Sequence, residues 1–318
     1  MTPSRPGPGA LSGSGSRTAA LALAALLVLA GCSAPVSPSE PTDTLTPAPV
    51  PTGDASAAAG AEAGSEPARS VEGRRLAPGL RTGGVADPFT LARAHGWILS
   101  NRSYTRADSR TVVDENGTLR ATRTDLLVAS GGTPFRLERS AVSSPRYDVQ
   151  SPYSTAAVYH DGDRAYYRVV DGNASYRTDG SVPPAEVVPD RTGRGEFVAL
   201  LTAFHWEVQP IEVGGEQYYR LTSAAFTAPD VLDDAYLLTD PRNAEARVLV
   251  DERGRVQRYR LEYETTYDGR TVGVTETVRW SAVSETSVNP PDWLDRARNA
   301  TEQSDAASQP GRVVGLPG

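Results

Sequence analysis

The chain has 318 residues, of which 39% are hydrophobic, and its 29 Gly and 25 Pro indicate that part of it lies outside any packed core. All 32 basic residues are Arg, and 39 acidic residues give a net charge of −7. An acidic chain without a basic block is a poor electrostatic partner for nucleic acid, so we expect none. The single cysteine, Cys32, excludes an intramolecular disulfide and a cysteine-based zinc cluster.

Residues 18–30 form an apolar run preceded by a polar segment whose only charges are Arg. A helix of this length spans about 20 Å, which is short for about 30 Å of membrane hydrocarbon, so the run is typical of a signal-peptide core. It ends in Leu29-Ala30-Gly31-Cys32, which resembles the lipobox of bacterial and archaeal lipoproteins. The resemblance implies cleavage after residue 31, a lipid on the Cys32 thiol, and residence on the outer face of the cell membrane. The alternative is ordinary signal cleavage beside a chance cysteine.

The distribution of aromatic residues divides the rest of the chain. Residues 32–85 are rich in Pro, Ser, Thr, Ala and Gly and contain no aromatic residue, which predicts a lipidated, disordered tether. All 22 aromatic residues lie between Phe89 and Trp293, so we predict one folded domain over 86–293. Residues 294–318 lack aromatics again and are predicted to be a disordered tail.

Two helices are predicted within the domain. Asp87-Pro88 is typical of a helix start, with a side-chain cap followed by proline at the first helical position. Helical spacing then places Phe89, Leu91, Ala92, His95 and Ile98 on one face, with Trp97 beside them, and the helix should end near Asn101. The second predicted helix covers 194–204, where Phe197, Leu200, Leu201 and Phe204 share a face.

Most of the remaining domain alternates with period two. Tyr259, Leu261 and Tyr263 share one face of a strand, and Ala165, Tyr167 and Val169 do so in another. Turn pairs separate the runs, as at 116–117, 161–162, 171–172, 214–215, 253–254 and 268–269. We therefore predict an α+β fold of about nine strands, a long curved antiparallel sheet with two helices over its concave face.

Four segments carry a resemblance to known families: residues 99–104, 159–167, 250–256 and 288–293, which are mostly turns and aromatics. They are similar to halophilic archaeal lipoproteins of unassigned function, and through them to LolA-like lipoprotein carriers and the mycobacterial LppX and LprG lipoproteins. The resemblance covers about 86–293 and implies a half-barrel whose apolar cavity holds acyl or isoprenoid chains. The residues expected to line such a cavity are Tyr259, Leu261, Tyr263, Val274, Val278 and Trp280. Packing of the same side chains into a filled core is the alternative.

Candidate catalytic and metal sites are sparse. His95, His160 and His205 have no second His or Cys at ligand spacing, so no metal or cofactor is expected. His205 precedes Glu207 on a predicted strand, but no nucleophile or oxyanion signature accompanies the pair. We therefore expect a protein that is not an enzyme.

Four glycosylation sequons begin at Asn101, Asn116, Asn173 and Asn299. Together, these features predict a monomeric cell-surface lipoprotein that binds a lipid or isoprenoid. The alternative function is a structural or interaction protein of the cell envelope with a fully packed core.

Overall fold

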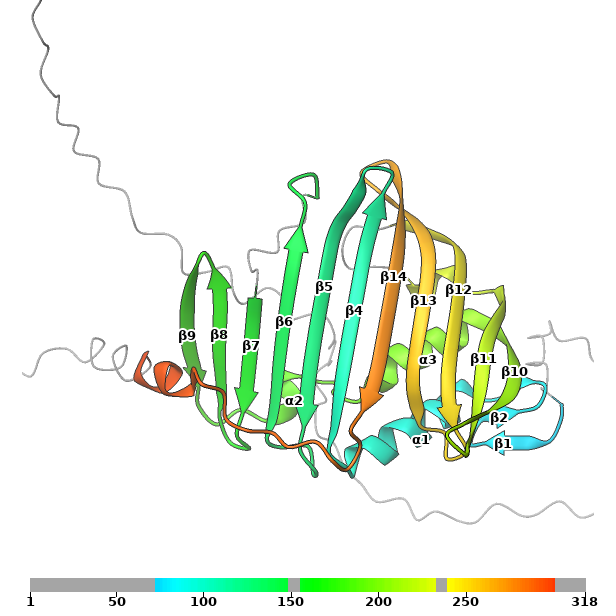
Figure 1. Ribbon diagram of the computed structural model, residues 1–318, viewed down its shortest axis with the longest axis horizontal. Coiled ribbons are helices and arrows are strands. Elements are labelled where there is room, and N and C mark those ends of the chain that lie inside the picture. Colours follow the sequence, from blue (N-terminus) through cyan, green and yellow to red (C-terminus); the bar gives the residue numbers. More distant parts are fainter. Residues whose placement is uncertain (1–71, 148–154, 233–238, 301–318) are drawn as a thin grey trace, which may run out of the picture. The chain divides into compact units, whose positions relative to one another are not determined.

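A long antiparallel sheet dominates the computed structural model, which describes residues 72–147, 155–232 and 239–300 (Figure 1). Its strand order is β10-β11-β12-β13-β14-β4-β5-β6-β7-β8-β9, and each neighbouring pair is antiparallel. The strands are β4 Tyr104–Asp114, β5 Gly117–Val128, β6 Phe135–Ser143, β7 Thr155–His160, β8 Ala165–Asp171, β9 Asn173–Asp179, β10 Phe204–Val213, β11 Glu216–Phe226, β12 Thr239–Asp251, β13 Val256–Tyr267 and β14 Arg270–Ser281.

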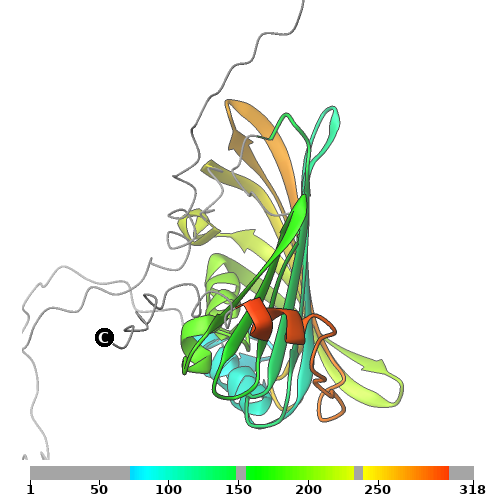
Figure 2. The same ribbon diagram turned by 90° about the vertical axis from the view of Figure 1, so that its left-hand side faces the viewer.

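Four helices of the described chain lie on one side of this sheet, which curves around them (Figure 2). They are α1 Pro88–Ser100, α2 Pro184–Val187, α3 Arg194–Ala203 and the short 3-10 helix η1 Pro229–Leu232. The predicted α+β class, with a curved sheet and helices over its concave face, is confirmed. Within the described residues the sheet has eleven strands rather than about nine.

Local sequence explains both long helices. The Asp87 carboxylate accepts a hydrogen bond from the Thr90 amide at 2.9 Å, and Pro88 opens α1. α1 ends at Ser100, as predicted, and α3 occupies 194–203 of the predicted 194–204. Leu91 and Leu99 of α1 and Phe197 and Leu201 of α3 are almost inaccessible to solvent.

The predicted tether boundary at residue 85 is wrong, because three short strands precede α1. These strands, β1 Arg75–Ala77, β2 Leu80–Arg81 and β3 Gly84–Val85, form a separate small sheet. Ala77 and Leu80 join the main hydrophobic cluster, so small apolar side chains suffice where aromatics are absent. The predicted signal peptide, Cys32 and most of the tether lie outside the described residues. Across the described ranges, no helix is both long enough and apolar enough to span a membrane.

The boundary at residue 293 is also wrong, because residues 294–300 are helical and partly buried. Leu294 and Ala297 pack with Trp293 against Tyr159 and Tyr166. Tyr159 and Tyr166 lie on the face of the sheet that contacts Trp293, whereas His160 lies on the concave face. Tyr166 is therefore more buried than Tyr167, the residue that alternation predicted to face inward.

The two edges of the sheet differ. β9 and β10 are the terminal strands, and neither pairs with the other among the described residues. β10 contains Pro210, whereas β9 contains no proline. Proline is tolerated in β10 because an outer strand does not need every backbone N–H for pairing.

Candidate functional site

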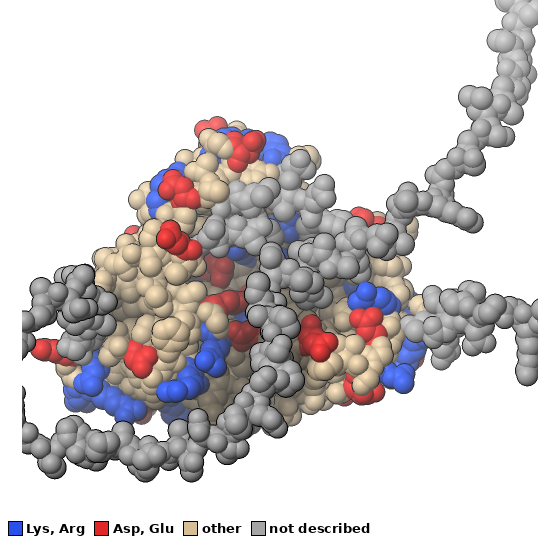
Figure 3. Space-filling view, turned by 180° about the vertical axis from the view of Figure 1, so that it is seen from behind, with Lys and Arg blue, Asp and Glu red and all other residues tan. Residues whose placement is uncertain are grey.

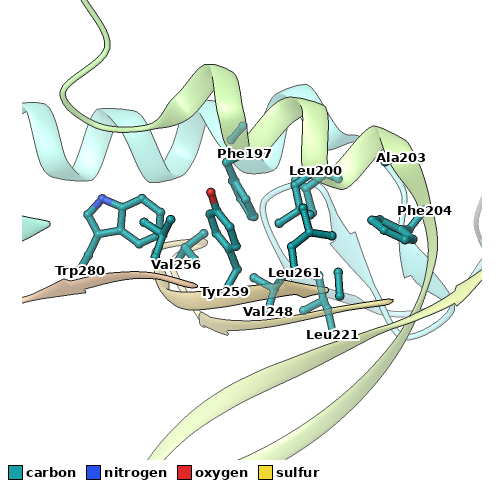
Figure 4. Packing of buried hydrophobic residues seen from close by; sticks show 14 of the residues in the cluster. Phe197, Leu200, Ala203, Phe204, Leu221, Val248, Val256, Tyr259, Leu261 and Trp280 are labelled. Atoms are coloured by element: carbon teal, nitrogen blue, oxygen red, sulfur yellow. The ribbon is translucent and has the colours of Figure 1, made fainter. Parts of the chain in front are cut away.

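The six residues predicted to line a cavity lie together on the concave face under α3. Tyr259 and Leu261 point from β13 toward Phe197 and Leu200, and Trp280 lies beside them (Figure 4). Tyr263, Val274 and Val278 belong to the same cluster, and all six are between 1% and 5% exposed. None of the six lines the hollows described below, and their contact with a ligand stays a prediction.

Two tyrosines of this cluster form hydrogen bonds with charged side chains. The Tyr259 hydroxyl donates to Glu276 Oε1 at 2.8 Å, and Arg110 donates to the Tyr263 hydroxyl oxygen at 2.6 Å. Burial first, and then Glu276, raise the pKa of Tyr259 well above its usual range. The concave face therefore carries a polar strip beside its apolar core, which period-two alternation did not predict.

Arg106 of β4 connects the sheet to the first turn of α3 through an ion pair. Its guanidinium is almost buried, pairs with Asp108 at 2.8 Å and with Glu196 of α3, and lies 5.7 Å from the Trp280 ring centre. Burial raises the pKa of both carboxyl groups, against the opposing effect of Arg106. Gly193 precedes α3 with a φ of 74°, and a side chain there would meet Arg106 at 2.7 Å.

His95 connects α1 to β13 and to the segment before α3. The Val256 amide donates to Nδ1 at 3.1 Å, so Nε2 carries the hydrogen and donates it to the Thr192 carbonyl, also at 3.1 Å. Burial lowers the pKa of His95 to about 4, and its ring packs edge-on against Trp280. A neutral, fully bonded imidazole in this position has a packing role.

The other two histidines differ in burial. His160 is buried, stacks on Phe135 and has its Nε2 2.7 Å from the Val182 carbonyl. His205 is exposed on β10. Within the part of the chain that the structure describes, no three His, Cys, Asp or Glu side chains gather as a metal site.

A hollow lies beside α1, and none of the predicted cavity residues lines it. Its volume is about 880 Å³, and its walls come from α1, the segment 189–195, the first turns of α3 and the β5–β6 turn. Leu99, Tyr104 and Val128 are nearly inaccessible and form its floor, and Val198 adds an apolar side wall. Pockets of a few hundred to about 1,000 Å³ with apolar linings are typical of small-ligand sites.

The outer wall of this groove is the exposed face of α1. Phe89 is 64% exposed and Trp97 is 70% exposed, with Arg93 between them at helical spacing. We predicted Phe89 on the buried face, and that prediction is wrong. The signal that could have corrected it is the i, i+4, i+8 series Phe89, Arg93 and Trp97, which forms a second face opposite Leu91 and Leu99.

Three arginines line the groove, namely Arg93, Arg191 and Arg194. Arg191 donates to the Pro184 and Val188 carbonyls at 2.9 and 3.1 Å. The one acid of the lining, Asp190, accepts from the Gly193 and Gly195 amides, which lowers its pKa against the effect of burial. The groove therefore combines an apolar floor with a cationic rim.

The four sequon asparagines are all exposed, and their glycosylation stays a prediction. Asn101 caps the end of α1 and donates to the Trp97 carbonyl at 2.9 Å. Asn116 lies in the β4–β5 turn, Asn173 opens β9, and Asn299 lies in the last described helical turn.

No family model matches this chain, and no curated protein matches it. Among solved structures, it is similar to a DUF1329 family protein from Desulfovibrio piger at 12% identity, covering 65% of this chain and 95% of that one, with a TM-score of 0.24. A LolA superfamily protein from Nitrosomonas europaea is 11% identical over 64% and 94% of the two chains, with a TM-score of 0.23. Such low scores support no argument about function, and the fold class rests on the strand order and helix placement.

Proposed function

We propose that this protein is an exported lipoprotein, anchored through Cys32, whose domain binds the apolar part of an amphipathic molecule in the groove beside α1. The groove itself carries the proposal, because it joins buried apolar side chains to a cationic rim. Burying the apolar part of a ligand there would contribute about 25 cal/mol per Å² removed from water. A lipid or isoprenoid with an anionic end fits both parts of the lining.

One observation favours the alternative of a structural or interaction protein of the envelope. The concave face under α3 is filled by Tyr259, Leu261, Trp280 and their neighbours, as Figure 4 shows. A ligand would therefore bind beside this core. If the groove binds no ligand, the packed core favours the alternative function of a structural or interaction protein of the envelope.

Ligand capture is tested on the mature chain with Cys32→Ser, purified without its anchor. Mass spectrometry of organic extracts should show a co-purifying amphipathic lipid, and a fluorescent fatty acid should bind saturably. Val198→Trp fills the groove and should weaken binding at least about tenfold. The matched control is Val142→Trp on β6, where the native side chain is 75% exposed outside the groove. Equal binding by both variants, or no saturable binding by the parent, would refute the carrier function.

The anchor is tested separately in cells. Cys32→Ser should remove the lipid mass and shift the protein out of the membrane fraction. An unchanged mass with unchanged membrane association would contradict lipidation of Cys32, and a persistent amino terminus would identify retention by an uncleaved signal.

A further inference from the structure

The exposed face of α1 is unusual for this protein. Among the described residues, Phe89 and Trp97 are the exposed aromatic residues, and the other three tryptophans, Trp206, Trp280 and Trp293, are at most 6% exposed. Both aromatics stand on one face of a single helix, separated by Arg93. An amphipathic helix with aromatic and Arg side chains on its outer face is typical of surfaces that lie in a membrane interface.

Positive charge collects around the same helix, although the whole chain has a net charge of −7. Arg93 and Arg194 line the groove, and neither forms a salt bridge within the described residues. Arg74, Arg75 and Arg81 are exposed on the small sheet that leads into α1. Figure 3 shows basic side chains gathered along the lower margin of this face. The nearby Asp87 and Asp190 carboxylates already cap α1 and α3.

The chain also enters the domain at this end. The described part begins at residue 72, the small sheet follows, and α1 starts at residue 88 (Figure 1). With a lipid on Cys32, as proposed above, residues 33–71 would connect the anchor to the domain and keep it near the membrane surface. A domain held in this way meets the membrane surface repeatedly.

We propose that the α1 face, defined by Phe89, Arg93, Trp97 and Arg194, docks on an anionic lipid surface, so that the groove opens toward the membrane. The aromatic rings enter the headgroup region, and the arginines bind lipid phosphates. This inference deepens the proposed function, since docking brings the groove to the source of an amphipathic ligand. The docking contact itself needs no ligand in the groove.

Docking is measured on the mature Cys32→Ser chain with vesicles of phosphatidylcholine alone or mixed with phosphatidylglycerol. Trp97 is the exposed tryptophan, so its emission should shift to shorter wavelength only with the anionic vesicles. The protein should co-sediment with the same vesicles, and salt should weaken the binding. Trp97→Phe should keep the sedimentation and lose the spectral shift.

The charge-reversal variant is Arg93→Glu with Arg194→Glu, which should weaken sedimentation at least about tenfold. The charge-matched control, Arg220→Glu with Arg258→Glu, changes exposed arginines on the opposite face of β11 and β13 and should bind like the parent. Equal sedimentation of the two double variants, or equal binding to neutral and anionic vesicles, would overturn the proposal. So would a dimer that Phe89→Ser with Trp97→Ser converts to monomer, because the face would then bind a second copy.

The two functions fail independently in these experiments. Val198→Trp should still dock on anionic vesicles while losing the fluorescent fatty acid. Loss of vesicle binding with fatty-acid capture intact contradicts docking alone, and the reverse result contradicts the groove alone.

Discussion

The two halves of the sheet differ in how their faces are covered. From β10 through β14 to β4, α1 and α3 cover the concave face, and that face holds Tyr259, Val278 and Trp280. From β7 to β8, the segment around Trp293 covers the other face, where Tyr166 is buried. Both halves show the same period-two alternation, so alternation identifies a strand without identifying the face that becomes core. The covering segment decides that, and it is distant in sequence.

The sharpest test of this difference is truncation of one aromatic in each half. Trp280→Ala should lower the free energy of unfolding by about 3–5 kcal/mol, because the ring is 1% exposed within the main hydrophobic cluster. Tyr167→Ala should cost clearly less, because Tyr167 of β8 is only half-buried. Denaturant unfolding measures both. A small loss for Trp280→Ala would mean that its ring lines open space, as in the cavity we predicted from the resemblance.

The covered half should also respond to pH through His95. Its pKa falls from 6.5 to about 4 on folding because burial disfavours the charged ring. The unfolded chain therefore takes up the proton first, and stability is lost as the pH falls from about 6.5 toward 4, by up to about 3 kcal/mol. His95→Gln keeps a donor and an acceptor without titrating. The free energies of unfolding of the two proteins, measured as a function of pH, should converge at low pH. A constant difference across the pH range would contradict a neutral buried His95.

A smaller effect is expected where the carboxyl-terminal segment covers the other half. Leu294→Ala should cost about 2 kcal/mol, because the side chain is 6% exposed near the end of the described chain. The neighbouring Asp295→Ala is the control, since Asp295 is exposed. Calorimetry of the variants, beside fragments 72–300 and 86–293, tests the revised boundaries. Equal melting temperatures for the two fragments would show that residues 72–85 and 294–300 add no stability, as the boundaries predicted from aromatic content imply.

The smallest effect is expected at the groove wall. Asp190→Asn should cost about 1 kcal/mol, since its carboxylate accepts several backbone amides before α3. Because folding lowers the pKa of this acid, its contribution is present above its usual value of 3.8 and is lost as the pH falls further. Thermal unfolding at pH 7 and pH 3 measures the difference, and an equal deficit at both would contradict a charged cap.

Sequence predicted the parts of the fold that depend on neighbours along the chain. Asp87-Pro88 placed the start of α1, and the Gly-containing turns placed six hairpins. It missed what depends on distant partners, such as burial of Ala77 and Leu80 against the main cluster. The groove was also missed, because α1, the segment 189–195 and the β5–β6 turn meet only in three dimensions. Phe89 was misplaced because its hydrophobicity alone suggested the interior.

The unequal edges of the sheet limit how copies of this protein can associate. Strand-by-strand growth into a fibril needs two receptive edges on every molecule. β10 ends the sheet on one side with Pro210, which has no N–H to give to an incoming strand. β9 ends the other side and contains no proline, so two molecules could pair through their β9 edges. That pairing would form a dimer and would not extend into a fibril. At high local concentration, this asymmetry favours reversible pairing over aggregation.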